Sequence, residues 1–152
     1  MKLAVMQPYI FPYIGYFQLI RAVDAFVFYD DVNFIKQGWI NRNQILTNGQ
    51  ANLFTIPLKK ASSFNLINET LINESLFVKW KKKFLRKIEQ SYAKAPFFEE
   101  YYPIVCKVIN CSTQTISEMA ILSVKETSTY LNLDVNFEVS SNKFPELQNF
   151  ER

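Results

Sequence analysis

The sequence predicts an α/β fold in which a parallel sheet begins with a β-α-β unit and the second half is helical. Two apolar, β-rich runs, residues 2–6 and 25–29, flank a segment with helical spacing. Asn48-Gly49 lies between two further runs typical of strands. Residues 77–93 and 115–131 carry apolar side chains at helical intervals. Together these features indicate a doubly wound type of sheet with an added β-hairpin.

The first third of the chain is expected to form the β-α-β unit. Residues 2–6 are predicted to be a buried first strand, and residues 15–22 a short helix. Residues 25–29 are apolar throughout, predict a second buried strand, and end at Asp30-Asp31. A strand-helix-strand order favours a right-handed crossover with the two strands parallel.

The middle of the chain is expected to contain a hairpin. Asn48-Gly49 suits a two-residue turn between strands at residues 44–46 and 52–56, and Pro57 limits the second strand. Residues 62–75 alternate apolar and polar side chains, which is typical of an edge strand or an extended segment.

The basic run at residues 79–87 belongs to the first long predicted helix, residues 77–93. Its aromatic side chains fall on the apolar face and its lysines mainly on the others, so we interpret the run as an exposed helix face. An anionic partner is the alternative.

The remaining elements are further helices and a last strand. Pro96 and Pro103 punctuate helical sequence that reaches about Asn110. A helix over residues 115–131 is predicted with Ser117 or Thr113 near its cap, and residues 133–139 alternate as a strand does.

The composition favours a globular protein in one domain, residues 1–152. Hydrophobic residues make up 49% and aromatic residues 16% of the chain, which is ample for one core. A net charge of +3 is too small to indicate nucleic-acid binding by itself. No apolar run has the length of a membrane span, and residues 1–6 are too short for a signal peptide, so a cytoplasmic location is expected.

The chain contains no histidine, which excludes several kinds of catalytic site. Ser-His-Asp and Cys-His nucleophiles, imidazole acid-base catalysis and most zinc sites need this residue. Cys106 and Cys111 are expected to be reduced, mostly buried thiols, because two cysteines five residues apart in a helix suit no disulfide framework.

The turn after the first predicted strand is the first candidate binding element. Gln7, Tyr13, Gly15 and Tyr16 lie where ligands bind in α/β sheets, outside the carboxyl end of a strand. Gly15 would let a ligand approach the backbone, and the following helix would present its N-terminus to an anion. The alternative is a loop braced by proline and packed by aromatic residues.

Residues 13–16, Tyr-Ile-Gly-Tyr, have the spacing and position of the HxGH motif of nucleotidylyltransferases, with both histidines replaced by tyrosine. A neutral phenol supplies no positive charge to a transferring phosphate, so we do not carry that chemistry over.

Asp30 and Asp31 are the candidate catalytic residues. They follow the second predicted strand and are therefore expected at the same edge of the sheet as the opening turn. Adjacent carboxylates could act as a base, hold a ribose or an amine, or bind a metal. Magnesium or a nucleotide is accordingly the candidate cofactor, although we assign no metal ligand. Capping a helix or ending a strand is the structural alternative.

Residues 36–43 are a dense set of hydrogen-bond donors beside an aromatic ring. Lys36, Trp39, Asn41, Arg42 and Asn43 suit recognition of a sugar, a nucleotide or a carboxylate. A hairpin whose amides satisfy its own turns is the alternative.

Lys59-Lys60 follow Pro57 at the end of a predicted strand. They could contact phosphate or form a solvated pair.

Three segments identify relatives of this sequence: QPYIFPYIGYFQLIRAVDAFVFYDDVNFIKQGWINRNQIL, residues 56–60 and IEQSYAKAPFFEEYYP. In these segments, and over nearly the whole chain, the sequence resembles the WbqC-like family of bacterial proteins. The residues that match the family's motifs are Gln7, Pro8, Pro12, Gly15, Tyr16, Asp30, Asp31, Lys36, Trp39, Asn41, Arg42, Asn43, Pro57 and Lys59.

The resemblance implies a role in surface-polysaccharide (O-antigen) biosynthesis, where some members are glycine or amino-acyl transferases acting on a sugar. Family members generally continue for some tens of residues past a segment like residues 148–152. We therefore expect a shortened or divergent member, or a site completed by a partner chain.

The leading hypothesis is a transferase that acts on an activated sugar or an amino-acyl donor. In it Gly15 would cradle an anionic group, Arg42 with Lys36 or Lys59 would neutralise phosphate or carboxylate, and Trp39 would stack on a ring. The ligand would be an anionic small molecule, and a homo-oligomer or an enzyme partner would fit.

Two other functions stay open. One is a non-catalytic ligand-binding or scaffold subunit of a glycan pathway, and the other is a nucleotidylyltransferase-like enzyme.

Overall fold

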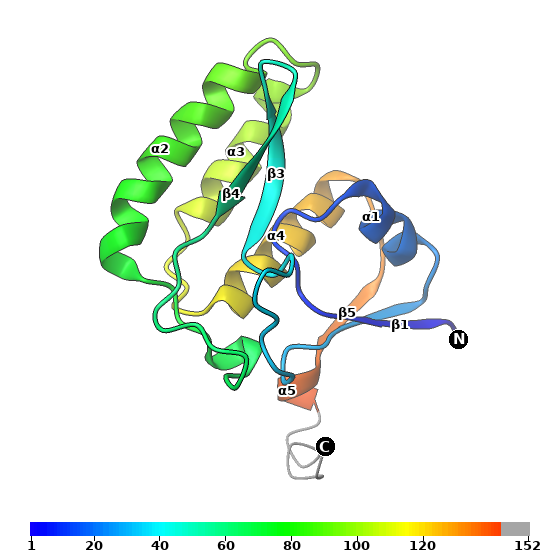
Figure 1. The fold of residues 1–152 in the computed structure, drawn as a ribbon. Helices are drawn as coiled ribbons and strands as arrows, with labels where there is room; N and C mark the ends of the chain where they lie inside the picture. The colour runs from blue at the N-terminus through cyan, green and yellow to red at the C-terminus, as the bar shows by residue number, and fades with distance from the viewer. Residues whose placement is uncertain (144–152) are drawn as a thin grey trace.

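The computed structural model describes residues 1–143, which form two small sheets with helices packed against them (Figure 1). The strands are β1 (Leu3–Met6), β2 (Ala25–Phe28), β3 (Arg42–Thr47), β4 (Gln50–Thr55) and β5 (Asn136–Val139). The helices are α1 (Ile14–Arg21), the 3₁₀ turn η1 (Ile67–Glu69), α2 (Glu74–Tyr92), α3 (Phe98–Ile109), α4 (Ile116–Tyr130) and α5 (Ser140–Lys143). The α/β class, with a parallel sheet, a hairpin and a helical second half, is confirmed.

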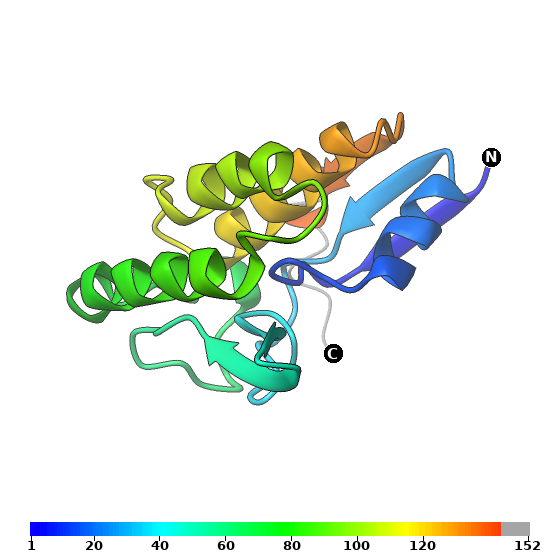
Figure 2. The same ribbon diagram turned by 90° about the horizontal axis from the view of Figure 1, so that it is seen from above.

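The parallel sheet has the strand order β1-β2-β5. Leu3 pairs with Ala25, and at the other end of β2 Phe28 pairs with Val139. The predicted β-α-β unit is therefore confirmed, and β5 extends it on the far side of β2. All residues of the central strand β2 are buried. Helices α1 and α4 lie on the same side of this sheet (Figures 1 and 2).

The prediction that the first strand is buried is wrong for one of its two faces. Ala4 faces α1 and α4 and is 7% exposed, but Leu3 and Val5 are 53% and 50% exposed. Successive side chains of a strand point to opposite faces, and the helices cover only the face that carries Ala4. No element within residues 1–143 covers Leu3 and Val5.

The hairpin forms at the predicted turn. Asn48 and Gly49 have φ angles of 53° and 75°, the left-handed conformation that a two-residue type I′ turn requires. Thr47 pairs with Gln50 across the turn, and the strands are longer than predicted because pairing continues to Arg42 and Thr55.

Residues 62–75 do not form the edge strand that their alternation suggested. The backbone makes only isolated bridges, such as Leu58 with Ile72, and turns through η1. The Ile67 N–H donates a hydrogen bond to the Val32 carbonyl (2.9 Å). The Thr70 carbonyl accepts one from the Ile116 N–H (3.0 Å). The segment is thus held between the loop after β2 and the start of α4, and does not pair continuously with one strand.

The helices of the second half follow the predicted periodicity. In α2 the rings of Phe77, Trp80 and Phe84 stack in succession toward the hairpin, with centroid distances of 5.5 and 4.8 Å. The basic side chains lie mostly on the exposed side of the same helix, as expected. The predicted cap of α4 is wrong: Thr115 caps the helix in a capping box with Glu118.

The buried side chains form two hydrophobic cores. The sheet core joins α1, β2 and α4 through residues such as Tyr16 and Phe26. The helical core joins the hairpin, α2, α3 and the start of α4. Tyr9 packs against both cores, and α4 contributes Met119 to the helical core and Val124 to the sheet core.

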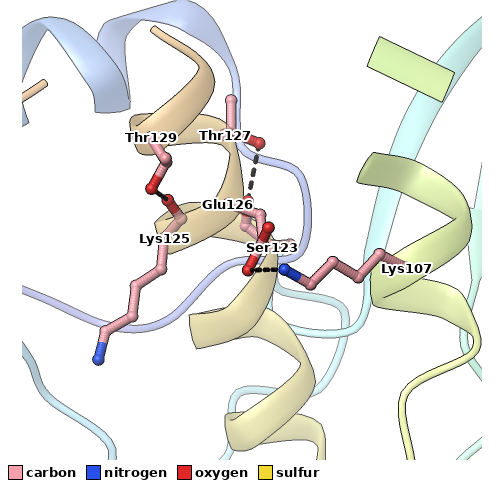
Figure 3. A network of polar contacts seen from close by, with 6 residues as sticks. All are labelled: Lys107, Ser123, Lys125, Glu126, Thr127 and Thr129. Carbon is pink, nitrogen blue, oxygen red and sulfur yellow. Dashed lines mark hydrogen bonds and ion pairs between the residues drawn. The ribbon is translucent and has the colours of Figure 1, made fainter. Parts of the chain in front are cut away.

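Helix α4 makes an ion pair with α3 and several polar contacts within itself. The Lys107 ammonium on α3 binds the Glu126 carboxylate at 2.7 Å, as Figure 3 shows. Thr127 and Thr129 donate their hydroxyl hydrogens to the carbonyls of Ser123 and Lys125, one turn earlier (Figure 3).

The two cysteines lie on α3 and just after it. Cys106 and Cys111 are free thiols as predicted, but both are only half-buried.

Candidate functional site

The carboxyl ends of β2 and β5 bring an aspartate pair next to a serine pair. Asp30 and Asp31 follow β2, and Ser140 and Ser141 follow β5 at the neighbouring position of the sheet. Parallel strands present their carboxyl ends at one edge, so segments about 110 residues apart in sequence meet there. The expectation that the aspartates lie at this edge is confirmed.

Asp30 is a buried carboxylate that accepts hydrogen bonds from two serines and lies within reach of a third. One oxygen accepts from the hydroxyls of Ser117 (3.0 Å) and Ser141 (3.1 Å). The other accepts from the Ser141 N–H (3.2 Å) and lies 3.3 Å from the Ser140 hydroxyl. Ser117 comes from the first turn of α4, so the carboxylate ties that helix to both strand ends.

The hydroxyl of Ser140 has one hydrogen and two carboxylates in reach. Its contact with Asp31 is the shorter one, so the hydrogen is donated mainly to Asp31. The same hydroxyl accepts from the Asp30 N–H at 3.2 Å. Both carboxylates are almost completely buried, with 3% and 8% exposure, and each is held by a hydroxyl of this network.

A cavity of about 480 Å³ opens beside this network. Asp30, Ser117 and Ser141 form one part of its wall, and Asn68 and Lys125 form others. The Asn68 side-chain oxygen is buried without a hydrogen-bond partner among the described residues. The Lys125 ammonium lies 5.9 Å from the ring centroid of Phe137. Hydroxyls, an unpaired amide oxygen and an ammonium together suit a ligand with many hydroxyl groups and a negative charge.

Three of the residues predicted from the segment 36–43, namely Lys36, Asn41 and Arg42, help to line a different cavity, of about 310 Å³. Trp39 and Asn43 do not line it. Arg42 uses its guanidinium within its own loop: it donates to the carbonyls of Gly38 (2.9 Å) and Gln37, and it stacks over Trp39 at 5.7 Å. The exposed Lys36 ammonium is therefore the more accessible charge of this cavity.

The amides of this segment bind backbone carbonyls. The Asn41 side chain donates to the Ile56 carbonyl at 3.0 Å and is 8% exposed. The Asn43 side chain donates to the carbonyls of Ile10 (3.2 Å) and Phe11. The Asn41 bond, which joins the two ends of the hairpin, is close to the alternative in which amides satisfy the hairpin itself, whereas Asn43 ties the hairpin to the opening turn. Lys59 is exposed and lines none of the three cavities that we describe.

The opening turn lies between the two cores. Ile10 is fully buried in the helical core, and Tyr9 contacts both cores. The Tyr16 ring is 2% exposed in the sheet core and its phenol donates to the Gln7 carbonyl at 2.9 Å. These positions match the packed, proline-braced loop that was the alternative to a ligand-facing turn.

Gly15 and Tyr13 lie at the exposed start of α1. A Cβ added to Gly15 would come within 2.3 Å of the Tyr13 ring, which is 72% exposed. The absence of a side chain at Gly15 therefore makes room for the Tyr13 ring in the described conformation. Neither residue lines the cavity beside Asp30.

Tyr16→Phe is expected to lower the free energy of unfolding by about 1–2 kcal/mol at pH 7, because the buried Gln7 carbonyl loses its donor. Burial raises the pKa of the Tyr16 phenol well above its ordinary value of 10.0. Above pH 10 the unfolded phenol therefore ionises while the folded one keeps its proton, so stability falls as pH rises. Urea unfolding at pH 7 and above pH 10 should show that the free energy of unfolding falls less steeply with pH in Tyr16→Phe than in the unmodified chain.

Tyr13→Phe is the matched control, since this phenol is exposed. It should leave both the stability at pH 7 and the pH dependence unchanged. An equally steep fall above pH 10 in Tyr16→Phe would contradict this account of Tyr16. The fall is not abolished, because burial also raises the pKa of the Tyr101 phenol.

Two further searches concern metals and membranes. Within residues 1–143, His, Cys, Asp and Glu side chains form no group of three that could hold a metal ion. In the same range no helix has the length and apolar character needed to cross a bilayer.

Sequence reasoning missed most of the polar residues around Asp30. Ser117 and Asn68 are far from Asp30 in sequence, and nothing local marks them. Ser140-Ser141 did carry a signal, because they follow a predicted strand just as Asp30-Asp31 follow another. The expected departure of the family pattern after residues 148–152 lies outside the described residues.

Comparisons with known proteins agree with the resemblance seen in the sequence. The model of the WbqC-like protein family matches residues 7–151. The chain is 32% identical over 156 aligned residues to an uncharacterized protein of Mycobacterium tuberculosis, Rv1507c. The alignment covers 97% of this chain and 66% of that relative, so the chain spans slightly less than two thirds of its length. No solved structure matches. The chain belongs to the WbqC-like protein family.

Proposed function

We propose that the protein is a transferase of bacterial surface-polysaccharide biosynthesis and binds the sugar part of an activated donor in the cavity beside Asp30. The observation that carries the proposal is the cavity of about 480 Å³ at the carboxyl ends of β2 and β5, in which hydroxyl, amide and ammonium groups are set in a mainly apolar wall. Its unpaired Asn68 oxygen calls for a donor from a ligand, such as a sugar hydroxyl. Lys125 would face the donor's phosphate or carboxylate.

The hydrogen bonds of Asp30 give this residue a positioning role in the proposal. A carboxylate has about four lone-pair sites, and the hydroxyls of Ser117 and Ser141 and the backbone N–H of Ser141 already occupy three of them. Asp30 therefore orients Ser117 and Ser141 and polarises their hydroxyls. The Ser141 hydroxyl, on a half-buried residue in the cavity wall, is the group we expect to contact the ligand.

A non-catalytic binding subunit of the same pathway is the second candidate, and the same hydrogen bonds favour it. With three of its lone-pair sites occupied and the Ser140 hydroxyl 3.3 Å away, Asp30 would need to release a serine before it could accept a proton from a substrate. Binding of a sugar ligand needs no such rearrangement.

The test of the binding site is isothermal titration calorimetry with a panel of uridine, guanosine and thymidine diphosphate sugars and amino-acyl adenylate analogues. We expect at least one compound to bind, and Asn68→Ala to weaken its affinity by about tenfold or more through loss of one buried hydrogen bond. Stability should hardly change, because the Asn68 oxygen has no partner to lose.

The control is Ser63→Ala, which removes an exposed polar group outside this cavity and should leave affinity unchanged. Failure of every panel compound to bind, or equal affinity in Asn68→Ala, would overturn the proposed site. Turnover of the bound donor by the isolated chain would favour the transferase over the binding subunit. Binding with no turnover would favour the subunit.

A further inference from the structure

A third cavity, of about 440 Å³, lies between the hairpin, α2, α3 and the end of α4. We call it the aromatic cavity because rings from these elements form most of its wall. Among them are Phe54, Phe84, Tyr92, Phe98 and Tyr101. Ligand pockets in proteins have this size and this mainly hydrophobic and aromatic lining.

The wall of the aromatic cavity carries no charge, since no Lys, Arg, Asp or Glu is among its described lining residues. Two of its phenols, those of Tyr92 and Tyr101, already make hydrogen bonds within the protein. The Tyr92 oxygen accepts from the Leu46 N–H at 2.7 Å. The Tyr101 phenol lies 2.8 Å from the Thr127 hydroxyl, whose hydrogen goes to the Ser123 carbonyl, so Tyr101 is the donor. A polar or charged occupant would therefore lose its hydration with little return.

Phe97 stands at the opening of the aromatic cavity in an unfavourable conformation. It lines the cavity yet is 69% exposed, and its φ and ψ angles of 62° and 13° are left-handed. An aromatic residue rarely adopts this conformation, and Phe97 makes no side-chain hydrogen bond as the cap of α3. The side chain thus contributes little to the fold, and an apolar occupant at the opening would bury it.

We propose that the aromatic cavity binds a linear alkyl chain of about ten to fifteen carbons, with the polar end of the ligand outside. A volume of 440 Å³ corresponds to about fifteen water-sized groups, more than a single aromatic ring would fill. The uncharged wall selects a neutral hydrocarbon, and the exposed Phe97 ring covers the chain where it leaves the cavity. This site is separate from the cavity beside Asp30, and the inference does not depend on the proposed function.

The test uses hexyl, octyl, decyl and dodecyl maltosides below their micelle concentrations, with the full chain. The neutral headgroup leaves chain length as the variable. Affinity is expected to rise about fourfold per methylene from hexyl through dodecyl, because even the dodecyl chain has fewer carbons than the cavity has room for. N-acetylphenylalanine amide, with one ring, should bind more weakly than the decyl compound.

Trp80 fluorescence provides a readout that calorimetry does not, because the Trp80 ring stacks at 4.8 Å on Phe84 in the cavity wall. The measurement is made in a Trp39→Phe background, so that only Trp80 reports. We expect the emission to shift with decyl maltoside along the same curve as the heat signal.

Phe97→Gly distinguishes a binding role of this ring from a structural one. Glycine adopts left-handed φ without strain, so the variant is expected to melt about 2–4 °C higher than the unmodified chain. The affinity for decyl maltoside should fall severalfold. Leu76→Ala is the control, because Leu76 is an exposed apolar residue of α2 outside the cavity and should leave affinity unchanged.

Ile88→Trp, which narrows the cavity from α2, should weaken the binding of decyl maltoside, as measured by calorimetry because the added tryptophan would obscure the Trp80 signal. The proposal is overturned if no alkyl maltoside binds, if affinity does not depend on chain length, or if Phe97→Gly binds the decyl compound as tightly as the unmodified chain.

Discussion

Asp30→Ala is expected to lower the free energy of unfolding by about 3–5 kcal/mol, the largest effect that we expect from a single polar side chain. The carboxylate accepts from Ser117, Ser141 and a backbone N–H, and it is 3% exposed. Its removal leaves these donors buried without a partner and releases α4 from the ends of β2 and β5. Urea unfolding followed by circular dichroism measures the loss.

Asp134→Ala is the matched control, since Asp134 is exposed in the loop before β5 and should change stability by less than about 0.5 kcal/mol. Asp30→Asn should fall between the two, because it keeps the shape but turns one acceptor into a donor that faces hydroxyls. A loss below about 1 kcal/mol for Asp30→Ala would show that the serines do not depend on this carboxylate.

Phe26→Ala is expected to cost about 3–5 kcal/mol, because it empties the middle of the sheet core. The Phe26 ring is fully buried and lies 5.3 Å from Tyr16, 5.2 Å from Phe28 and 6.1 Å from Phe137. Thermal and urea unfolding of the variant should both show the loss.

The control for this variant lies on the neighbouring strand. Val5 belongs to β1, points to the opposite face from Phe26 and is 50% exposed. Val5→Ala should cost less than about 1 kcal/mol, since little buried surface is lost. A similar cost for the two variants would contradict the placement of Val5 on an uncovered face of the sheet.

The sequence predicts local elements well where one physical constraint dominates. The β-α-β unit follows from two apolar runs around a helical spacing, and the hairpin follows from a turn that needs two left-handed residues, Asn48 and Gly49. The edge-strand interpretation of residues 62–75 was wrong because their alternation comes from contacts with several partners in turn, among them Val32 and Ile116. Periodicity cannot distinguish that from pairing with one strand.

The candidate site was predictable only as far as its edge of the sheet. Asp30 and Asp31 had to lie at the carboxyl edge because they follow a buried strand. Their partners come from the first turn of α4 and from the end of β5, and the order of strands that unites them is set by tertiary packing. The spacing of residues along the chain does not reveal this strand order.

The donor-rich segment 36–43 shows that composition can also suggest ligand contacts where the polar side chains bind the protein's own backbone. Its composition suits ligand recognition, but Asn41 and Arg42 satisfy carbonyls of their own loop and of β4. A polar side chain can meet its hydrogen-bonding needs locally or with a ligand, and composition does not separate the two.

The two cores are nested along the chain, with consequences for how the protein assembles. The sheet core takes its strands from residues 3–28 and 136–139, and nearly all of the helical core comes from the sequence between them. The sheet can therefore close only after an intervening segment of about 100 residues has been drawn together, at a loop-closure cost that shrinks if that segment is already compact. The loop-closure cost is lowest if folding starts in the hairpin and the long helices. Helix α4 then brings β5 next to β2. The β1-β2 pair, although made first, would receive its third strand, β5, last.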